Sequence, residues 1–253
     1  MRRRDFFCGL FSISAIGCAK EDPNERANAA FVEAMKLLKD VPMLDTQSAT
    51  LAYRKAMAGL DSIATKYPTS NLAVQLSTGQ QIGDFRRADI ERKLLILSGS
   101  MRPTLSVNDS ILVLKYDNVR PKPGHIVVYR LPSDGSIYVQ RLIAMANERV
   151  QMIKGALHLN GQAVMRERMA DFEEKIEGAT TRVKRWRETL PTGESYETLD
   201  LIENGFFDDT APITVSAGHF FVMGDNRDNS TDSRVPVHGE VPNGNLIGRA
   251  VLP

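Results

Sequence analysis

The feature that most constrains this chain is a run of eleven polar residues near its C-terminus, Gly224–Arg234. Every residue in the run is Gly, Asn, Asp, Arg, Ser or Thr, and the run directly follows the apolar segment Phe220–Met223. This pattern predicts a strand that leads into a tight loop, because Asn, Asp, Ser and Gly hydrogen-bond to the backbone and tolerate unusual dihedral angles. A solvated hairpin turn needs only about two such residues. The longer run therefore predicts an internally hydrogen-bonded loop, here called the polar loop.

A second run, Ser98–Leu105, follows the apolar segment Leu94–Leu97 and has the sequence Ser-Gly-Ser-Met-Arg-Pro-Thr-Leu. This run and the polar loop, in this order, resemble two motifs of bacterial signal peptidase I. The resemblance spans roughly residues 96–253 and includes segments 185–191 and 241–250. It implies a serine endopeptidase that cleaves signal peptides or exported proteins after small residues. It also implies a mainly antiparallel β fold for this part of the chain.

The resemblance assigns roles to individual residues. Ser100 is the implied nucleophile, and its backbone N–H and the hydroxyl of Ser98 would form the oxyanion hole. Ser230 would orient the general base. The charged residues implied to hold the loop are Asp225, Arg227, Asp232 and Arg234, the last two as an ion pair. These residue types suit the chemistry, because a serine hydroxyl needs an adjacent base and fixed donors stabilise an oxyanion. The resemblance implies no metal and no cofactor.

The chain departs from the family at the general base. The family uses a neutral lysine in a Tyr-x-Lys-Arg strand, and the matching segment here is Tyr138-Val139-Gln140-Arg141. The amide of Gln140 cannot act as a general base near neutral pH. Arg141 cannot replace it, because a guanidinium stays protonated and strand alternation places Arg141 on the opposite face. His125 and His238 are the candidate substitutes, and the alternative for each is a structural or solvent-exposed role.

Two functions of different classes follow from this departure. The first is a signal-peptidase-type serine endopeptidase with a displaced or weak base. The second is a catalytically inactive pseudopeptidase that binds extended peptides or envelope partners in the same cleft. Retention of the serine motif and the polar loop favours the first function, and the glutamine at position 140 favours the second.

The first 18 residues predict export. A basic start is followed by the apolar or small stretch Phe6–Gly17, which is too short to span a bilayer because a spanning helix needs about 20 residues. Gly17-Cys18 resembles a bacterial lipobox, and cleavage before Cys18 would remove Cys8, the only other cysteine. A single terminal cysteine favours acylation. We therefore expect a lipid-anchored protein that faces the periplasm, and the alternative is an ordinary signal peptide or an uncleaved, marginal anchor.

Residues 24–93 predict a helical domain, because apolar residues recur there at helical spacing. The two stripes are Phe31, Met35 and Leu38, and Tyr53, Met57, Leu60 and Ile63. Asp45 is placed to cap the second helix, and a third helix is expected from about Leu72 to Gln80. The spacing within 56–73 resembles a tetratricopeptide-type hairpin. One such unit cannot bury both of its faces, so we expect it to dock on the β domain or bind a partner; the alternative is a plain spacer.

The remaining sequence predicts β structure, which makes the fold class α+β. The expected strands are 110–115, 126–130, 137–143, 150–153 and 156–159, separated by turn signals such as Asp134-Gly135 and Asn160-Gly161. The charge-rich stretch 165–184 is predicted to be an insertion in the β domain, residues 96–253. A net charge of +1 with 25% charged and 42% hydrophobic residues fits a soluble globular protein without a nucleic-acid-binding patch.

Overall fold

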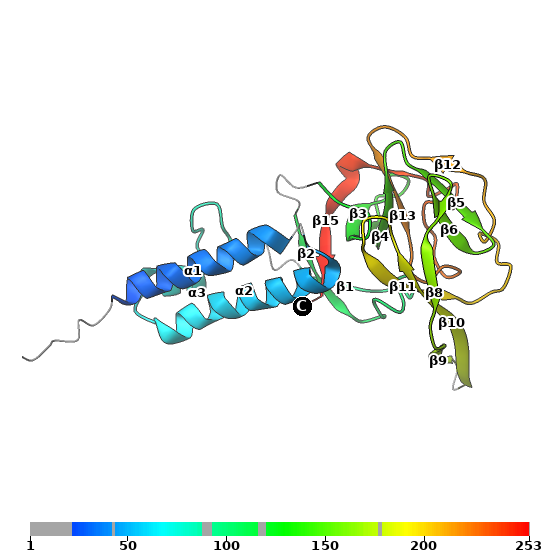
Figure 1. Cartoon of the computed structure of the whole chain (residues 1–253). Coiled ribbons are helices and arrows are strands. Elements are labelled where there is room, and N and C mark those ends of the chain that lie inside the picture. Colours follow the sequence, from blue (N-terminus) through cyan, green and yellow to red (C-terminus); the bar gives the residue numbers. More distant parts are fainter. Residues whose placement is uncertain (1–21, 42–43, 88–92, 116–119, 177–178, 253) are drawn as a thin grey trace, which may run out of the picture.

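The computed structural model describes residues 22–41, 44–87, 93–115, 120–176 and 179–252, which form a helical part and a β part lying end to end (Figure 1). The predicted export segment, residues 1–18 with Cys18, lies outside the described residues. In the described ranges, no helix has both the length and the apolar character needed to cross a membrane.

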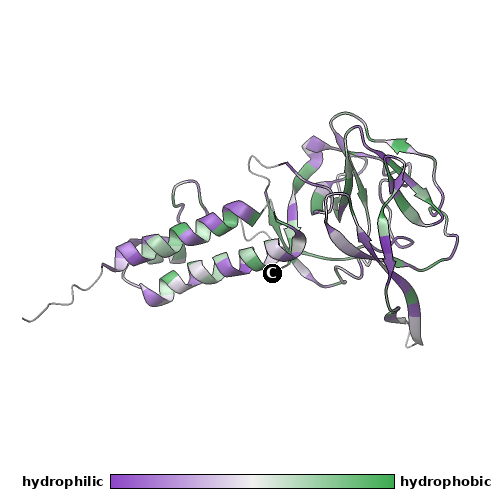
Figure 2. Cartoon of the chain, viewed as in Figure 1, coloured by the Kyte–Doolittle hydropathy of each residue, from purple (hydrophilic) through white to green (hydrophobic). Residues whose placement is uncertain are grey.

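The helical part contains α1 (Pro23–Asp40), α2 (Thr46–Lys66) and α3 (Asn71–Thr78). Each helix begins at a side-chain cap: Asp22, Asp45 and Ser70 accept hydrogen bonds from backbone N–H groups of the first turn. Apolar and polar residues alternate along the helices (Figure 2), and the apolar ones form a shared core. Its buried members are Ala27, Ala34, Ala56, Leu60, Ile63, Leu72, Ala73, Leu76 and Phe85. The likeness of this unit to a tetratricopeptide hairpin stays a prediction.

The helical part docks on the β part through the end where α1 meets α2. Ala49 and Tyr53 of α2 share a small core with Leu112 and Leu114 of the β part. The guanidinium of Arg249 extends this contact by donating hydrogen bonds to the carbonyl oxygens that precede α2, at 3.0 and 2.6 Å. The helices therefore pack against the β part through apolar side chains and charge-assisted hydrogen bonds.

The main sheet has seven antiparallel strands in the order β1-β2-β15-β3-β4-β13-β14. Their bounds are β1 (Lys93–Leu95), β2 (Ser110–Leu114), β3 (Ile126–Arg130), β4 (Ile137–Met145), β13 (His219–Met223), β14 (Val241–Pro242) and β15 (Leu246–Val251). A short 3-10 helix, η2 (Asn243–Asn245), lies between the last two strands. Because β1 pairs with β2, this sheet begins at Lys93, three residues before the expected start of the β domain at residue 96.

The central strands of the main sheet are buried on both faces. In β3, Ile126 and Val128 pack into one core and Val127 and Tyr129 into another. This arrangement explains why the strand is a continuous apolar run in the sequence, since strands buried on both sides need no polar alternation. Such a buried sheet provides fixed backbone positions for side chains at its edge.

Two smaller sheets complete the β part. One has the order β12-β5-β6-β7 and the other the order β11-β10-β8, with β9 paired to β10. Their bounds are β5 (Arg149–Ile153), β6 (Ala156–Leu159), β7 (Gln162–Ala163), β8 (Met165–Arg168), β9 (Phe172–Ile176), β10 (Ala179–Thr189), β11 (Ser195–Asp200) and β12 (Ile213–Thr214).

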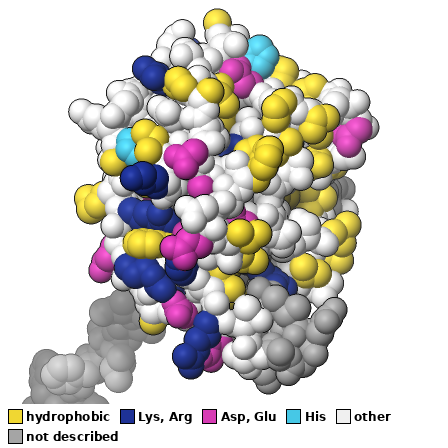
Figure 3. Space-filling model, turned by 90° about the vertical axis from the view of Figure 1, so that its right-hand side faces the viewer, with side chains coloured by type: hydrophobic (Ala, Val, Ile, Leu, Met, Phe, Trp, Pro, Cys, Tyr) yellow, Lys and Arg dark blue, Asp and Glu magenta, His cyan; other side chains and the backbone are white. Residues whose placement is uncertain are grey.

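The charge-rich stretch 165–184 forms part of the sheet that contains β8, β9 and β10, and its β9–β10 hairpin projects from the body (Figure 1). Basic and acidic side chains lie beside one another on this side of the molecule (Figure 3). One such exposed pair joins Arg182 to Glu173 across the hairpin, with 3.3 Å between Nε and Oε1. Arg166 stacks on the ring of Trp186 at 3.9 Å. Some charges of this stretch therefore pair across neighbouring strands, as Arg182 and Glu173 do.

Candidate active site

The polar loop is held by hydrogen bonds that it makes to itself. The carboxylate of Asp232 lies 2.8 Å from Nη2 of Arg234, and their side chains are 0% and 2% exposed. Asp232 also accepts the backbone N–H of Gly224 at 3.0 Å, and Arg234 donates to the carbonyl oxygen of Arg227 at 2.6 Å. Burial alone would raise the pKa of Asp232, but Arg234 and the N–H donors outweigh burial and lower it. Asp232 and its ion pair with Arg234 thus link the end of the polar loop to Gly224 at its start, where β13 ends.

Two further buried ion pairs fix the loop to neighbouring strands. Asp225 accepts two hydrogen bonds from Arg141 of β4, at 2.8 and 2.7 Å. Arg227 donates two to Glu188 of β10, at 3.0 and 2.5 Å. Burial opposes the charge on Arg141, but Asp225 outweighs it and raises the pKa of the guanidinium. Sequence reasoning placed Arg141 on the face opposite Gln140 but identified neither Arg141 nor Glu188 as a partner of the loop.

The polar loop also contacts the run Ser98–Leu105, here called the serine segment. The backbone N–H of Asn226 donates to the carbonyl oxygen of Ser100 at 3.0 Å, and its side-chain amide donates to that of Gly99 at 3.1 Å. Thr104 hydrogen-bonds to Asp225. Gly224 allows this close approach, because a Cβ atom there would lie 2.6 Å from the carbonyl oxygen of Ser100. The two sequence motifs are therefore joined directly.

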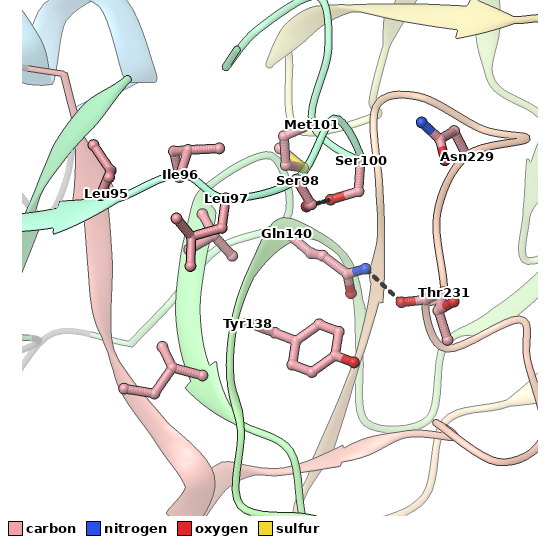
Figure 4. A pocket seen from close by; sticks show the side chains of 12 residues that line it. Leu95, Ile96, Leu97, Ser98, Ser100, Met101, Tyr138, Gln140, Asn229 and Thr231 are labelled. Atoms are coloured by element: carbon pink, nitrogen blue, oxygen red, sulfur yellow. Dashed lines mark hydrogen bonds between the residues drawn. The ribbon is translucent and has the colours of Figure 1, made fainter. Parts of the chain in front are cut away.

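Ser100 lies at a cavity of about 440 Å³ between the serine segment, β4 and the polar loop (Figure 4). Its hydroxyl lies 3.0 Å from that of Ser98. The residues that line the cavity are Leu95, Ile96, Leu97, Ser98, Ser100, Met101, Ile137, Tyr138, Val139, Gln140, Asn229 and Thr231. Apolar side chains with a few convergent polar groups are typical of binding sites. Leu97 is 80% exposed, so apolar surface continues out of the cavity.

Gln140 faces this cavity from β4, and both the oxygen and the nitrogen of its amide are hydrogen-bonded. Its Nε2 donates to Ser230 Oγ at 3.1 Å. It also donates to the carbonyl oxygen of Thr231 at 2.8 Å (Figure 4). Its Oε1 accepts from the hydroxyl of Tyr129 at 2.6 Å. Gln140 is only 1% exposed, and its side chain makes three hydrogen bonds. The structure brings Ser98, Ser100, Gln140 and Ser230 to the same site.

The sequence matches the family model of signal peptidase, peptidase S26, over residues 85–253. The chain belongs to this family. The match covers most of the chain and begins after the three helices, so α1, α2 and α3 lie outside the matched range.

Relatives of this chain carry the name signal peptidase I. The protein of Rickettsia typhi is 32% identical over 182 residues, which cover 60% of this chain and 67% of that protein. The protein of Pseudomonas aeruginosa is 34% identical over 179 residues, or 61% of each chain. A solved signal peptidase I from Enterococcus faecalis aligns at 22% identity with a TM-score of 0.31, over 51% of this chain and 96% of that one.

In this signal peptidase family member, neither candidate histidine, His125 or His238, hydrogen-bonds to Ser100. Among the residues that the structure describes, no lysine or histidine nitrogen hydrogen-bonds to the hydroxyl of Ser100. Burial, with Arg249 and Lys122 nearby, lowers the pKa of His125 to about 3. An imidazole with so little proton affinity is a poor general base near neutral pH. Burial and this low pKa therefore favour a structural role for His125 over a role as the base.

His238 is buried as well, and it contacts Tyr129 instead of Ser100. Its Nε2 lies 2.8 Å from the hydroxyl of Tyr129, and its Nδ1 lies 3.0 Å from the carbonyl oxygen of Gly239. Tyr129 is no substitute base, because burial raises the pKa of its hydroxyl and keeps it protonated. The site therefore combines the hydrogen-bonded serine pair Ser98 and Ser100 with a neutral amide at position 140.

Proposed function

We propose that this protein is a signal-peptidase-type serine endopeptidase of the bacterial cell envelope with low turnover. It would cleave signal peptides or other exported proteins after small residues. The observation that carries the proposal is the contact of Gln140 with Ser230 at the cavity of Ser100. It supports the assignment of position 140 as the place of the family's general base, now filled by an amide.

In this proposal the peptide carbonyl lies beside Ser100, and the hydroxyl of Ser100 attacks it. The backbone N–H of Ser100 and the hydroxyl of Ser98 would donate to the oxyanion, where each fixed donor contributes about 2.7–4 kcal/mol in a measured case. Ser230 would orient the group at position 140, and Asp225, Arg227, Asp232 and Arg234 would hold the loop that supports these groups. The serine proton would pass to solvent water, which would also protonate the leaving amine, because no described side-chain base hydrogen-bonds to the hydroxyl. A positioned general base contributes about 10²–10⁴-fold in rate to such a transfer, so turnover would be low.

A second function is favoured by the hydrogen bonds of Gln140. Both the oxygen and the nitrogen of the Gln140 amide have hydrogen-bond partners. The side chain is therefore a fixed part of the cleft wall. Such a cleft supports binding of extended peptides without cleavage, as a pseudopeptidase. In either function, acylated Cys18 would anchor the protein to the membrane, and the helical part would be available to an envelope partner. We propose no metal, cofactor or nucleic-acid partner.

The experiment compares cleavage and binding of one signal-peptide substrate by four purified proteins. Wild type should cleave slowly, Ser100→Ala should not cleave, and Gln140→Lys should cleave faster than wild type. Gln151→Lys is the matched control, because Gln151 lies on β5 and bonds to Thr210 outside the cavity. This control should cleave at the wild-type rate.

The outcomes separate the two functions. Efficient cleavage by wild type without a gain in Gln140→Lys would show that another base exists. Peptide binding without cleavage by wild type would establish the pseudopeptidase. Absence of both cleavage and binding would reject both proposals.

A further inference from the structure

The cavity at Ser100 has two ends of different character. Figure 4 shows the apolar side chains of residues 95–97 on one side of Ser100, and Asn229 and Thr231 of the polar loop on the other. Further apolar lining comes from Ile137 and Val139 of β4. One end of the cavity is therefore mainly apolar, whereas the other end is formed by polar residues.

This difference fits the two halves of an exported peptide. An export signal joins an apolar segment to a cleavage site of small residues, and the mature chain follows the cut. The apolar end of the cavity suits the segment before the cut. The chain after the cut would then leave past the polar loop. This orientation rests on the proposed function, in either its peptidase or its peptide-binding form.

Asn229 presents an amide to the polar end of the cavity. Its Nδ2 is turned toward the serine segment and lies 3.5 Å from the place where a Cβ atom on Gly99 would be. Within the described residues, the side-chain amide of Asn229 has no hydrogen-bond partner, and Figure 4 draws none for it. The amide can therefore donate to, or accept from, the backbone of a bound peptide.

The backbone that carries this amide is fixed. The N–H of Asn229 donates to the carbonyl oxygen of Asn226 at 3.0 Å, and the N–H of Asn226 donates to the carbonyl oxygen of Ser100 at 3.0 Å. The neighbouring carboxylate of Asp228 accepts two backbone N–H groups of the segment after β11, at 2.7 and 2.9 Å. A group on a fixed backbone loses less conformational freedom when it binds a ligand.

We propose that Asn229 is a substrate-binding residue that holds the peptide backbone on the C-terminal side of the scissile bond. Its Nδ2 would donate to the carbonyl oxygen of the first residue after that bond. This hydrogen bond needs a chain that continues beyond the cut, and it depends on no particular side chain. It therefore favours cleavage or binding within a longer chain over capture of a peptide that ends at the cut.

The test measures the binding of two peptides to Ser100→Ala, so that no turnover is needed. Both peptides carry the same export-signal segment, and both end in an amide. One stops at the small residue before the cut, and the other continues for two residues. The longer peptide should bind about 2–10-fold more tightly, because one neutral hydrogen bond is added. Asn229→Ala, introduced into Ser100→Ala, should remove this gain.

Two further variants test the direction of the hydrogen bond and its place. Asn229→Asp keeps the size of the side chain but replaces the donor by acceptors, so it should weaken binding of the longer peptide below that in Asn229→Ala. Asn245→Ala is the matched control, because Nδ2 of Asn245 donates to the carbonyl oxygen of Arg130 at 2.8 Å, outside the cavity. This control should keep the full gain.

The shorter peptide reports on the rest of the cavity, so a general change in folding would affect both peptides alike. A gain that persists in Asn229→Ala would overturn the proposal. Equal binding of the two peptides to Ser100→Ala would also overturn it, while the proposed function would stand. If neither peptide binds, the proposed function fails, and the role of Asn229 fails with it.

Discussion

The buried ion pair of the polar loop gives the sharpest stability prediction. Asp232 accepts hydrogen bonds from the backbone N–H groups of Gly224 and Arg234, at 3.0 and 3.1 Å. It accepts two more from the guanidinium of Arg234, at 2.9 and 2.8 Å. Asp232→Ala would leave that guanidinium charged, 2% exposed and without its carboxylate. Removing one partner of a buried pair costs about 3–5 kcal/mol, and for a chain of this size each kcal/mol lowers Tm by about 2–4 °C.

Thermal unfolding followed by circular dichroism should therefore show Asp232→Ala melting about 6–20 °C below wild type. Glu173→Ala is the matched control, because its carboxylate pairs with Arg182 at 3.3 Å on the surface, where the side chains are 60% and 72% exposed. An exposed pair contributes less than about 1 kcal/mol. Ser100→Ala removes one hydroxyl at the cavity and should also change Tm little. Equal, small shifts in all three variants would refute the bracing role of Asp232.

Three further predictions concern other residues of the chain. Because burial holds the pKa of His125 at about 3 against 6.5 when unfolded, its contribution to stability is complete above pH 6.5 and is lost as pH falls toward 3. Between pH 3 and 6.5, His125→Asn should therefore reduce the slope of the free energy of unfolding against pH by about 1.4 kcal/mol per pH unit. An unchanged slope would contradict a buried neutral His125. Gly224→Ala should destabilise by about 1–3 kcal/mol through its clash with the carbonyl of Ser100, and a wild-type Tm would contradict that packing. Cys18→Ser should abolish lipid labelling and release the protein from membranes, and attachment that persists at high salt would rule out the lipid anchor.

The helices and several strands could be predicted from local sequence, whereas strands β8, β9 and β10 lie in or overlap the stretch 165–184, which was expected only as a charged insertion. The expected strands 126–130 and 156–159 coincide with β3 and β6, because apolar or alternating runs stop there at turn residues. Asp45 caps α2 through the N–H of Ser48 as its position before the apolar stripe indicates. The expected boundary at residue 96 differs from the start of the sheet at Lys93, because β1 is short and its membership depends on pairing with β2.

The sequence by itself determined the residue types of the site, since Ser98, Ser100, Gln140 and the polar loop are recognisable as motifs. Only the tertiary structure decided their partners. Arg141 meets Asp225 because β4 lies beside β13, and Tyr129 meets His238 across a sequence separation of 109 residues. Helical and strand periodicities act over a few residues, so they carry no information about which distant polar groups meet. The order of strands in the main sheet provides that information, and it places a buried amide, a phenol and an imidazole in one hydrogen-bonded series beside the serine pair.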